Sequence, residues 1–173
     1  ESLAKQIQKI SSRRKKFLVV RMFDDDPLRI SDSLITKLYM DQVRKGARIT
    51  ARALDADGIL YAFGEENFSS EQAQQEFKTE PYERYFILHT KQYPDGFKDE
   101  LCNYYRRAAK KDADFNISTK DLFVDSSTMY EVCQAVENDV PSINKYVHFS
   151  GNSLSVSCFL NVKIGTLLKD VVK

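Results

Sequence analysis

The sequence predicts an α+β fold, with a ferredoxin-like βαββαβ core followed by a C-terminal αβαββ extension. The chain has 173 residues, of which 42% are hydrophobic and 29% charged, which is enough for one domain with a buried core. Residues 17–90 read as strand, helix, strand, strand, helix, strand, because β-prone runs alternate there with segments of helical spacing. That order is the split βαβ pattern of a ferredoxin-like sheet.

Before this core, residues 1–16 are expected to form a helix and a basic junction. Apolar residues recur at helical spacing from Leu3 to Ile10, which predicts a short amphipathic helix over residues 2–11. The basic run at 13–16 is typical of a solvated junction, with phosphate binding as the alternative.

The first strand and the first helix of the core have clear boundary signals. Residues 17–23 are nearly all apolar, as in a strand covered on both faces, and the acidic run before Pro27 ends that strand. Ser31 or Asp32 can cap the next helix, and Gly46 is expected to end it.

Two strands joined by a tight turn form the centre of the predicted core. Ile49, Ala51 and Ala53 alternate with polar residues, so the first of these strands has one apolar and one polar face. The turn sequence Asp-Ala-Asp-Gly at 55–58 joins it to an apolar second strand that reaches Phe63. The pattern therefore predicts a β-hairpin.

The remaining segments complete the core and supply the extension. The predicted elements are a helix from Ser69 or Ser70 to Phe77, a strand at 85–90, a turn at 94–96, a helix at 97–111, a strand at 121–124, a helix at 126–137, a hairpin of strands 146–149 and 154–164, and a short C-terminal helix. We expect residues 1–173 to form one domain, divided into 1–16, 17–90 and 91–173.

Charge and cysteine content argue against several classes of protein. The net charge of +1 gives no argument for binding nucleic acid or a membrane surface, and no apolar run approaches the ~20 residues of a membrane span. Cys102, Cys133 and Cys158 lack Cys-x-x-Cys spacing and are expected to be buried thiols in a reducing cytoplasm. With two histidines a His-rich metal site is excluded, so a bound metal would be Mg²⁺ or Mn²⁺ on carboxylates.

Two acidic clusters are expected to converge at one edge of the predicted sheet. Asp24, Asp25 and Asp26 follow the first strand, while Asp55 and Asp57 lie at the tip of the hairpin. A right-handed crossover makes the first two strands parallel, and the first strand should pair beside the third. Carboxylates that meet there can share divalent cations and hold nucleotide phosphates. The alternative for the hairpin aspartates is that they only form the turn.

Four motifs in this order resemble those of class III nucleotidyl cyclases, which have a palm-type core. The run Ala-Asp-Gly-Ile-Leu-Tyr-Ala-Phe at 56–63 resembles that family's hairpin, which reads Gly-Asp-Gly-x-x-Ala-x-Phe. Residues 85–90 resemble its Ile-Gly-Ile-His-Thr strand, and residues 103–107 match the Asn-x-x-x-Arg spacing of its next helix. Residues 116–119 loosely resemble its short Ile-x-Val-Ser strand, so the motifs extend over residues 17–125.

The resemblance implies a metal site for the cyclisation of a nucleoside triphosphate. Asp25 and Asp57 would bind two Mn²⁺ or Mg²⁺ ions, with Asp24 or Asp26 as alternatives to Asp25. Such ions would lower the pKa of the 3′-hydroxyl and neutralise the α-phosphate and the leaving pyrophosphate.

The resemblance also implies two catalytic residues and a homodimer. Asn103 would orient the ribose, and Arg107 would stabilise charge on the triphosphate in the transition state. Residues four apart share one face of a helix, so both can reach one ligand. Members of the family usually complete the site across a homodimer, with aspartates from one subunit and the Asn/Arg pair from the other. The alternative is that both residues belong to the exposed face of an amphipathic helix.

The family's usual purine-reading pair is not visible in this chain. Arg52 would contact the base from the hairpin, and Tyr93, Asp95 and Asp99 would contact it from the segment before the next helix. As a compact chain with altered base readers, the sequence resembles the pyrimidine (uridylate or cytidylate) cyclases of bacterial Pycsar anti-phage defence. UTP is therefore the first expected substrate, and cyclic UMP the expected product.

These patterns lead to the hypothesis of a cytoplasmic, homodimeric nucleotidyl cyclase that makes a 3′,5′-cyclic nucleotide second messenger and pyrophosphate. The alternatives are a non-catalytic ferredoxin-like module that binds RNA or dimerises, and a pseudoenzyme that kept the fold. RNA binding is disfavoured by the near-zero net charge and by the poor match of residues 58–63 to an RNP motif.

Overall fold

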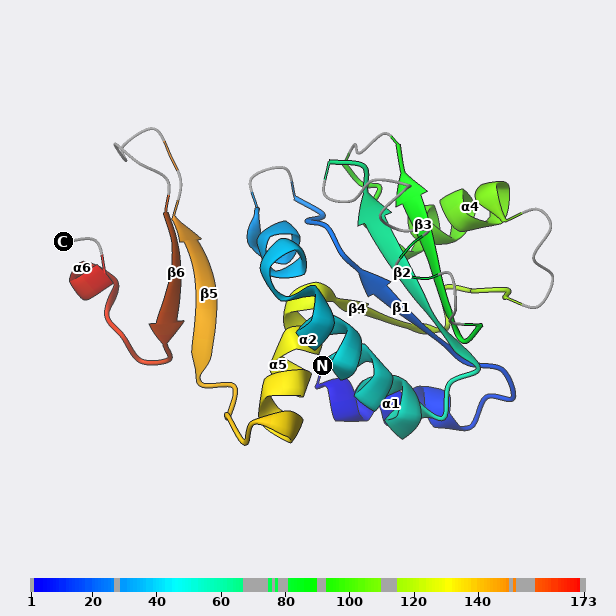
Figure 1. Cartoon of the computed structure of the whole chain (residues 1–173), viewed down its shortest axis with the longest axis horizontal. Helices are drawn as coiled ribbons and strands as arrows, with labels where there is room; N and C mark the ends of the chain where they lie inside the picture. Colours follow the sequence, from blue (N-terminus) through cyan, green and yellow to red (C-terminus); the bar gives the residue numbers. More distant parts are fainter. Residues whose placement is uncertain are drawn as a thin grey trace.

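The chain folds into a four-stranded sheet with helices packed on it and a separate two-stranded hairpin beside it (Figure 1). The structure is a computed structural model that describes residues 2–26, 29–66, 75, 77, 81–89, 93–109, 115–149, 151 and 158–171. Its elements are α1 (Leu3–Ser11), β1 (Phe17–Arg21), α2 (Ser31–Leu54), β2 (Gly58–Gly64), β3 (Glu83–Leu88), α4 (Lys98–Ala108), β4 (Leu122–Asp125), α5 (Ser126–Glu137), β5 (Asn144–Phe149), β6 (Cys158–Lys163) and α6 (Leu168–Val171).

All four strands of the main sheet run parallel, in the order β3-β2-β1-β4. In this register, Val19 of β1 lies between Leu60 of β2 and Phe123 of β4. The chain adds β2 and β3 on one side of β1 and then returns to add β4 on the other side. The strand order therefore reverses between β1 and β4, where the two carboxyl ends lie next to each other.

Side chains of β1 alternate between two apolar cores. Leu18 and Val20 pack in one core with residues of α1, α2 and α5, whereas Phe17 and Val19 pack in the other with α4. Because both faces of the strand are covered, every apolar position in it is buried. This confirms the sequence-based prediction of a central strand covered on both faces.

The predicted hairpin is wrong in its first strand, because the segment before the turn is the second half of the long helix α2. Val43, Ala47, Ala51 and Leu54 are all buried, at the spacing of one face of a helix. Apolar and polar residues alternate over 48–53, a pattern that predicts a strand. The buried apolar residues at helical spacing pack on the sheet instead, and this packing determines the fold. The helix ends at Asp55, which adopts a left-handed conformation with φ 55° and ψ 52°.

Gly46 does not end the helix, contrary to the prediction from the sequence. It lies inside α2 where the helix crosses α5, and a Cβ atom placed on it would lie 1.8 Å from the carbonyl oxygen of Met129. The glycine therefore allows two helix backbones to approach closely, which is a packing role rather than a capping role.

The predicted fold class is confirmed only in part. The chain contains helices and a sheet, as predicted, and the parallel strands of its main sheet are those of an α/β arrangement. A ferredoxin-like core needs an antiparallel hairpin, whereas β2 lies parallel to β1 after a helical crossover. The strand β4, which lies in the predicted extension 91–173, pairs with β1 in the same sheet.

The other predicted elements are confirmed within a few residues, and α5 has the predicted bounds. The helix predicted from Ser69 or Ser70 to Phe77 lies outside the described residues except for residues 75 and 77, which are helical. Cys102 and Cys133 are buried free thiols, as expected, but Cys158 is exposed. Among the described residues, no helix has both the length and the apolar character to cross a membrane.

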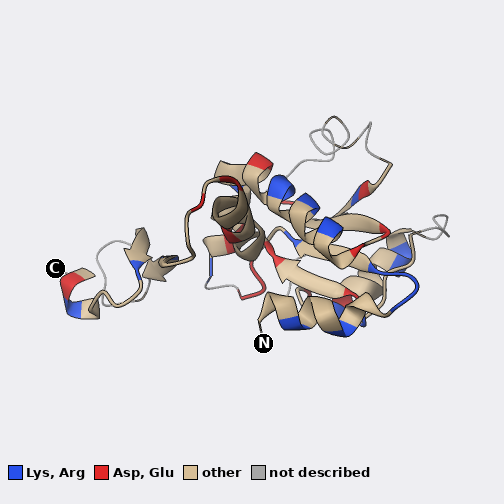
Figure 2. Ribbon diagram, turned by 90° about the horizontal axis from the view of Figure 1, so that it is seen from below, with Lys and Arg blue, Asp and Glu red and all other residues tan. Residues whose placement is uncertain are grey.

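The hairpin of β5 and β6 packs against the helical layer through aromatic rings. Tyr146 and Phe159 stack at 5.2 Å between ring centroids, and Tyr146 also contacts Tyr130 of α5 and Tyr39 of α2. Tyr39 has non-helical backbone angles, which mark a kink in α2. The hairpin thus packs beside the kink, away from the main sheet (Figure 1 and, from below, Figure 2).

Candidate functional site

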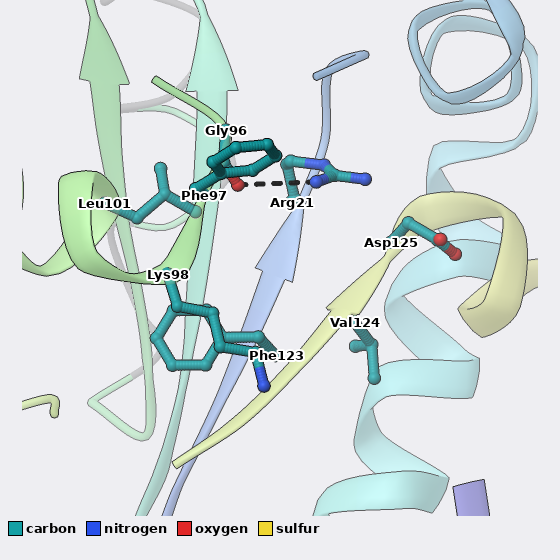
Figure 3. A pocket seen from close by; sticks show the side chains of 8 residues that line it. All are labelled: Arg21, Gly96, Phe97, Lys98, Leu101, Phe123, Val124 and Asp125. Carbon is teal, nitrogen blue, oxygen red and sulfur yellow. Dashed lines mark hydrogen bonds between the residues drawn. The ribbon is translucent and has the colours of Figure 1, made fainter. Parts of the chain in front are cut away.

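A cavity of about 220 Å³ opens at the carboxyl ends of β1 and β4 (Figure 3). Its lining residues come from these two strands and from the start of α4: Arg21, Gly96, Phe97, Lys98, Leu101, Phe123, Val124 and Asp125. The strand order of the sheet reverses at this point. In open parallel α/β sheets, ligands bind in the crevice outside the carboxyl ends of the strands where the order reverses. The cavity is therefore the candidate functional site.

Arg21 forms the charged wall of the cavity. Its Nη1 atom donates to Oδ2 of Asp25 at 2.9 Å and to the carbonyl oxygen of Gly96 at 3.3 Å. Its Nε atom is buried and has no hydrogen-bond partner among the residues that the structure describes. A buried donor without a partner is costly, so this N–H group is available to a ligand or a water molecule.

The start of α4 supplies a mixed aromatic and basic wall. Phe97 is 46% exposed, and the Lys98 Nζ atom lies 5.5 Å from the centroid of the Phe123 ring. Phe97 precedes the helix and has no polar side chain to cap it, so the first N–H groups of α4 lack a side-chain acceptor from this residue. The cavity thus combines two aromatic rings with two cations, Arg21 and Lys98 (Figure 3).

Gly96 fits closely between the loops on either side of the cavity. A Cβ atom on Gly96 would lie 2.6 Å from Cβ of Asp25. The loop before α4 therefore approaches the loop after β1 more closely than any larger residue allows.

The acidic loop after β1 has structural partners rather than a free face. Asp24 is buried and accepts hydrogen bonds from the backbone N–H groups of Asp32 (2.9 Å) and Ser33 (3.0 Å), so it caps α2. Asp25 pairs with Arg21 and with Arg29.

Asp32 is fully buried and forms hydrogen bonds with both the β4–α5 turn and the segment between β1 and α2. Its Oδ1 atom accepts from the hydroxyl and the backbone N–H of Ser127, and its Oδ2 atom accepts from Arg29 at 3.1 Å. Burial and the nearby carboxylates of Asp125 and Asp24 raise the pKa of Asp32 to about 6, although its hydrogen bonds with Ser127 lower it.

The structure does not bring together the aspartates predicted to bind metal. Asp57 precedes β2 at the amino edge of the sheet, where its Oδ2 accepts from the Lys16 N–H at 2.8 Å. Asp25 follows β1 at the carboxyl edge, as do its alternatives Asp24 and Asp26. Because β1 and β2 are parallel, five strand residues at ~3.3 Å each separate the two edges by roughly 16 Å, too far for shared ions. Among the described residues, no three His, Cys, Asp or Glu side chains cluster closely enough to hold a metal.

The two residues predicted to be catalytic lie on α4, away from the cavity lining. Asn103 is half-buried and Arg107 is exposed, one helical turn further along. Neither of them lines the cavity. Their shared helix face confirms only the local part of the prediction.

The residues predicted to read the base divide between the two edges of the sheet. Tyr93 and Asp95 lie in the segment that leads into α4 and Asp99 lies inside α4, and all three are close in sequence to the lining residues Gly96, Phe97 and Lys98. Tyr93 packs on Phe97, and Asp95 is buried and accepts from the hydroxyl of Tyr104 at 3.3 Å. Asp99 is exposed in the first turn of α4.

Arg52 is the exception among these predicted base readers. It is exposed in the last turn of α2, at the amino edge of the sheet. Four lining residues were not predicted from the sequence: Arg21, Lys98, Phe123 and Asp125. Arg21 and Asp125 end β1 and β4, and Lys98 begins α4 shortly after the Pro-Asp-Gly turn. These positions indicate a site only when it is known that β1 and β4 are neighbours.

No protein-family model matches the sequence, and no curated protein matches it either. Solved structures match at the level of fold. A chain of NAD⁺-reducing [NiFe]-hydrogenase in the air-oxidized state matches with a TM-score of 0.71 and 16% identity, over 98% of this chain and 34% of that chain. A chain of NAD⁺-reducing [NiFe]-hydrogenase in the H₂-reduced state matches with a TM-score of 0.61 and 15% identity, over 79% of this chain and 27% of that one. Our chain spans about a third of the length of these hydrogenase chains.

Proposed function

We propose that this chain is a nucleotide-binding module of a redox enzyme, and that it holds a nicotinamide or flavin nucleotide in the cavity between β1 and β4. The observation that carries the proposal is the position of the cavity at the reversal of a β3-β2-β1-β4 parallel sheet. This is the strand order and the position at which dinucleotide-binding α/β folds hold their ligand.

The residues of the cavity fit one end of such a nucleotide. Phe97 and Phe123 offer aromatic faces to a planar ring, and the Nε–H of Arg21 offers a donor to its polar atoms, while Lys98 is exposed and offers its ammonium to a phosphate. At about 220 Å³ the cavity is smaller than the ~300–1,000 Å³ of sites that enclose a whole ligand. The rest of the nucleotide would therefore lie along the surface.

The loop after β1 departs from the usual dinucleotide-binding pattern. It lacks the Gly-x-Gly-x-x-Gly sequence that lets a pyrophosphate reach the N-terminus of the following helix. Here the carboxylate of Asp24 already accepts from the first N–H groups of α2. The phosphate groups must therefore bind elsewhere, and Arg21 and Lys98 are the cations that line the cavity.

The match to NAD⁺-reducing hydrogenase chains supports a redox context for this proposal. It covers nearly the whole of this chain within a chain about three times as long. A module of this kind would work as one part of a larger electron-transfer assembly.

Nucleotidyl cyclase activity stays an untested prediction, as do UTP as substrate, two Mn²⁺ or Mg²⁺ ions, the homodimer and cytoplasmic location. The separation of Asp25 from Asp57 removes the geometric reason for it within one chain. We therefore prefer the nucleotide-binding module, and a turnover assay with UTP and Mn²⁺ gives the direct test of the cyclase.

The proposal is tested by titrating the purified chain with NADH, followed by fluorescence, and with FMN, followed by quenching of its fluorescence. We expect binding of at least one of them, and Lys98→Glu should weaken it at least tenfold, since one reversed charge beside a phosphate readily changes binding by ~1.4 kcal/mol. Arg52→Glu makes the same change in net charge at the opposite edge of the sheet and serves as the matched control. Absence of binding by both nucleotides, or equal loss in the two variants, would contradict the proposal.

A further inference from the structure

Asp32 is a fully buried carboxylate near the start of α2 that contacts residues at and next to the lining of the proposed site. An isolated buried carboxylate is strongly unfavourable, so its retention depends on the hydrogen bonds and ion pairs that it receives. Those partners come from two different walls of the cavity, and this arrangement suggests a role beyond capping a helix.

One carboxylate oxygen holds the turn between β4 and α5. The Oδ1 atom of Asp32 accepts from the hydroxyl and the N–H of Ser127, and the hydroxyl of Ser126 lies 3.3 Å away. Ser126 also donates to the backbone oxygen of Asp32 at 2.9 Å. These contacts fix the position of the residue immediately before them, Asp125, which lines the cavity.

The other carboxylate oxygen faces two arginines, Arg21 at the end of β1 and Arg29 just before α2. The Oδ2 atom of Asp32 accepts from Nη2 of Arg29 at 3.1 Å, and Nη2 of Arg21 lies 3.9 Å from it. Arg21 is the residue whose buried Nε–H has no partner among the described residues. Asp32 thus balances the charge of the side chain that forms the opposite wall.

The structure assigns Asp32 as a positioning residue that holds Arg21 and the β4–α5 turn in the geometry needed for binding at the cavity. This inference rests on the proposed nucleotide site. Asp32 does not line the cavity, so it acts on the ligand only through Arg21 and Asp125. Replacing it with Asn keeps an oxygen for Ser127 but removes the negative charge that faces Arg21 and Arg29.

Asp121 provides a matched control for this substitution. It is also a buried aspartate with an arginine partner, since Oδ1 accepts from Arg13 at 2.6 Å. Its Oδ2 accepts from Ser118 N–H at 2.7 Å, and Ser118 Oγ lies 3.2 Å away. Asp121 lies just before β4, at the opposite edge of the sheet from the cavity. A merely structural role for Asp32 would give the two variants the same effects.

The experiment compares the wild type, Asp32→Asn and Asp121→Asn by three measurements. These are the melting temperature, the affinity for NADH and FMN, and the NMR signal of the Arg21 Nε–H group in the ligand-free protein. Asp121→Asn is expected to lower the melting temperature, because it removes the charge that pairs with Arg13. We expect only Asp32→Asn to shift the Arg21 signal and to weaken nucleotide binding at least tenfold. Should Asp32→Asn not fold, Ser127→Ala removes one tether while keeping the carboxylate, and it should weaken binding in the same direction.

The Arg21 signal and the two affinities decide whether Asp32 positions Arg21. An unchanged Arg21 signal in Asp32→Asn, or equal losses of affinity in the two variants, overturns the inference. If the wild type binds neither nucleotide, the proposed function fails, and the Arg21 signal alone then decides whether Asp32 positions this side chain.

Discussion

Gly46 of α2 lies against the backbone of Met129 in α5, so that a Cβ atom on the glycine would come within 1.8 Å of the Met129 carbonyl oxygen. The two helices pack over the face of the sheet on which Leu18 and Val20 of β1 lie. Their close approach fixes where α5 begins, and with it the turn that lines the cavity.

Gly46→Ala is therefore expected to destabilise the protein, although alanine is the better helix former by ~1 kcal/mol. The added methyl group must push two backbones apart, which typically costs ~1–3 kcal/mol and exceeds the gain in propensity. Urea denaturation should show a lower free energy of unfolding. Arg52→Ala, at an exposed position of the same helix, should leave it within ~0.5 kcal/mol. A Gly46→Ala variant more stable than the wild type would contradict the observed packing.

The second prediction concerns pH. The pKa of Asp32 is raised from 3.8 to about 6 in the folded protein, mainly because burial disfavours the charged carboxylate. A raised carboxylate pKa means that the folded state binds a proton that the unfolded state has lost, so this group destabilises the fold as the pH rises from about 4 through 6.

Asp32→Asn is neutral throughout and serves as the reference for this titration. Between pH 4 and pH 7, the free energy of unfolding of the wild type should fall by about 2 kcal/mol relative to that of the variant, which follows from the two pKa values. The check is urea denaturation of both proteins at several pH values. A constant difference between them across this range would show that Asp32 does not titrate there.

The third prediction compares two arginines that share one buried carboxylate. Glu83 is 2% exposed, and Arg44 donates both Nε (3.2 Å) and Nη2 (2.7 Å) to one of its oxygens, while Arg48 donates to the other. The Arg44 guanidinium also lies 4.6 Å from the centroid of the Phe77 ring. Arg44 is 11% exposed and Arg48 is 47% exposed.

Arg44→Met should lower the free energy of unfolding by ~3 kcal/mol, because it leaves Glu83 buried without its better partner. Arg48→Met removes a partly solvated contact and should cost less than ~1 kcal/mol. Chemical denaturation of the two variants side by side makes the comparison. Equal losses would mean that burial of the arginine does not determine its contribution.

The fourth prediction separates a structural role of Asp57 from a catalytic one. Asp57 joins the starts of β1 and β2, because its N–H donates to the Lys16 carbonyl at 2.7 Å and its carboxylate accepts from the Lys16 N–H. Asp57→Ala should lower the free energy of unfolding by ~1–3 kcal/mol and leave NADH and FMN affinity unchanged. Metal-dependent cyclisation of UTP that disappears in this variant would instead support the cyclase hypothesis.

The sequence predicted most elements because their signals are local. The apolar residues from Leu3 to Ile10 have helical spacing, residues 17–23 are apolar except for Arg21, and a turn precedes α4. The error at residues 46–53 has a physical cause, since glycine both ends helices and allows close helix packing. Only the contact with Met129 distinguishes these two roles.

The candidate site was harder to predict because it depends on strand order. A strand at residues 48–53 would place Asp57 at the carboxyl edge of the sheet, next to Asp25. The predicted metal site depended on this strand, which is a helix in the structure. Arg21 and Asp125 end two strands that are neighbours in space but distant in sequence. No local pattern indicates that pairing, whereas the position of Tyr93 and Asp95 in the segment before α4 could be predicted from the turn at 94–96; their role as base readers stays a prediction.

The central place of β1 also has a consequence for the nascent chain. One edge of β1 pairs with β2, but the other waits for β4, because Leu18 pairs with Leu122, about 100 residues later. A ribosome that adds ~5–20 residues per second leaves this edge open for roughly 5–20 s. An apolar strand with a free edge is a template for pairing with other chains. A strand whose apolar residues are all buried in the folded protein thus needs protection during synthesis.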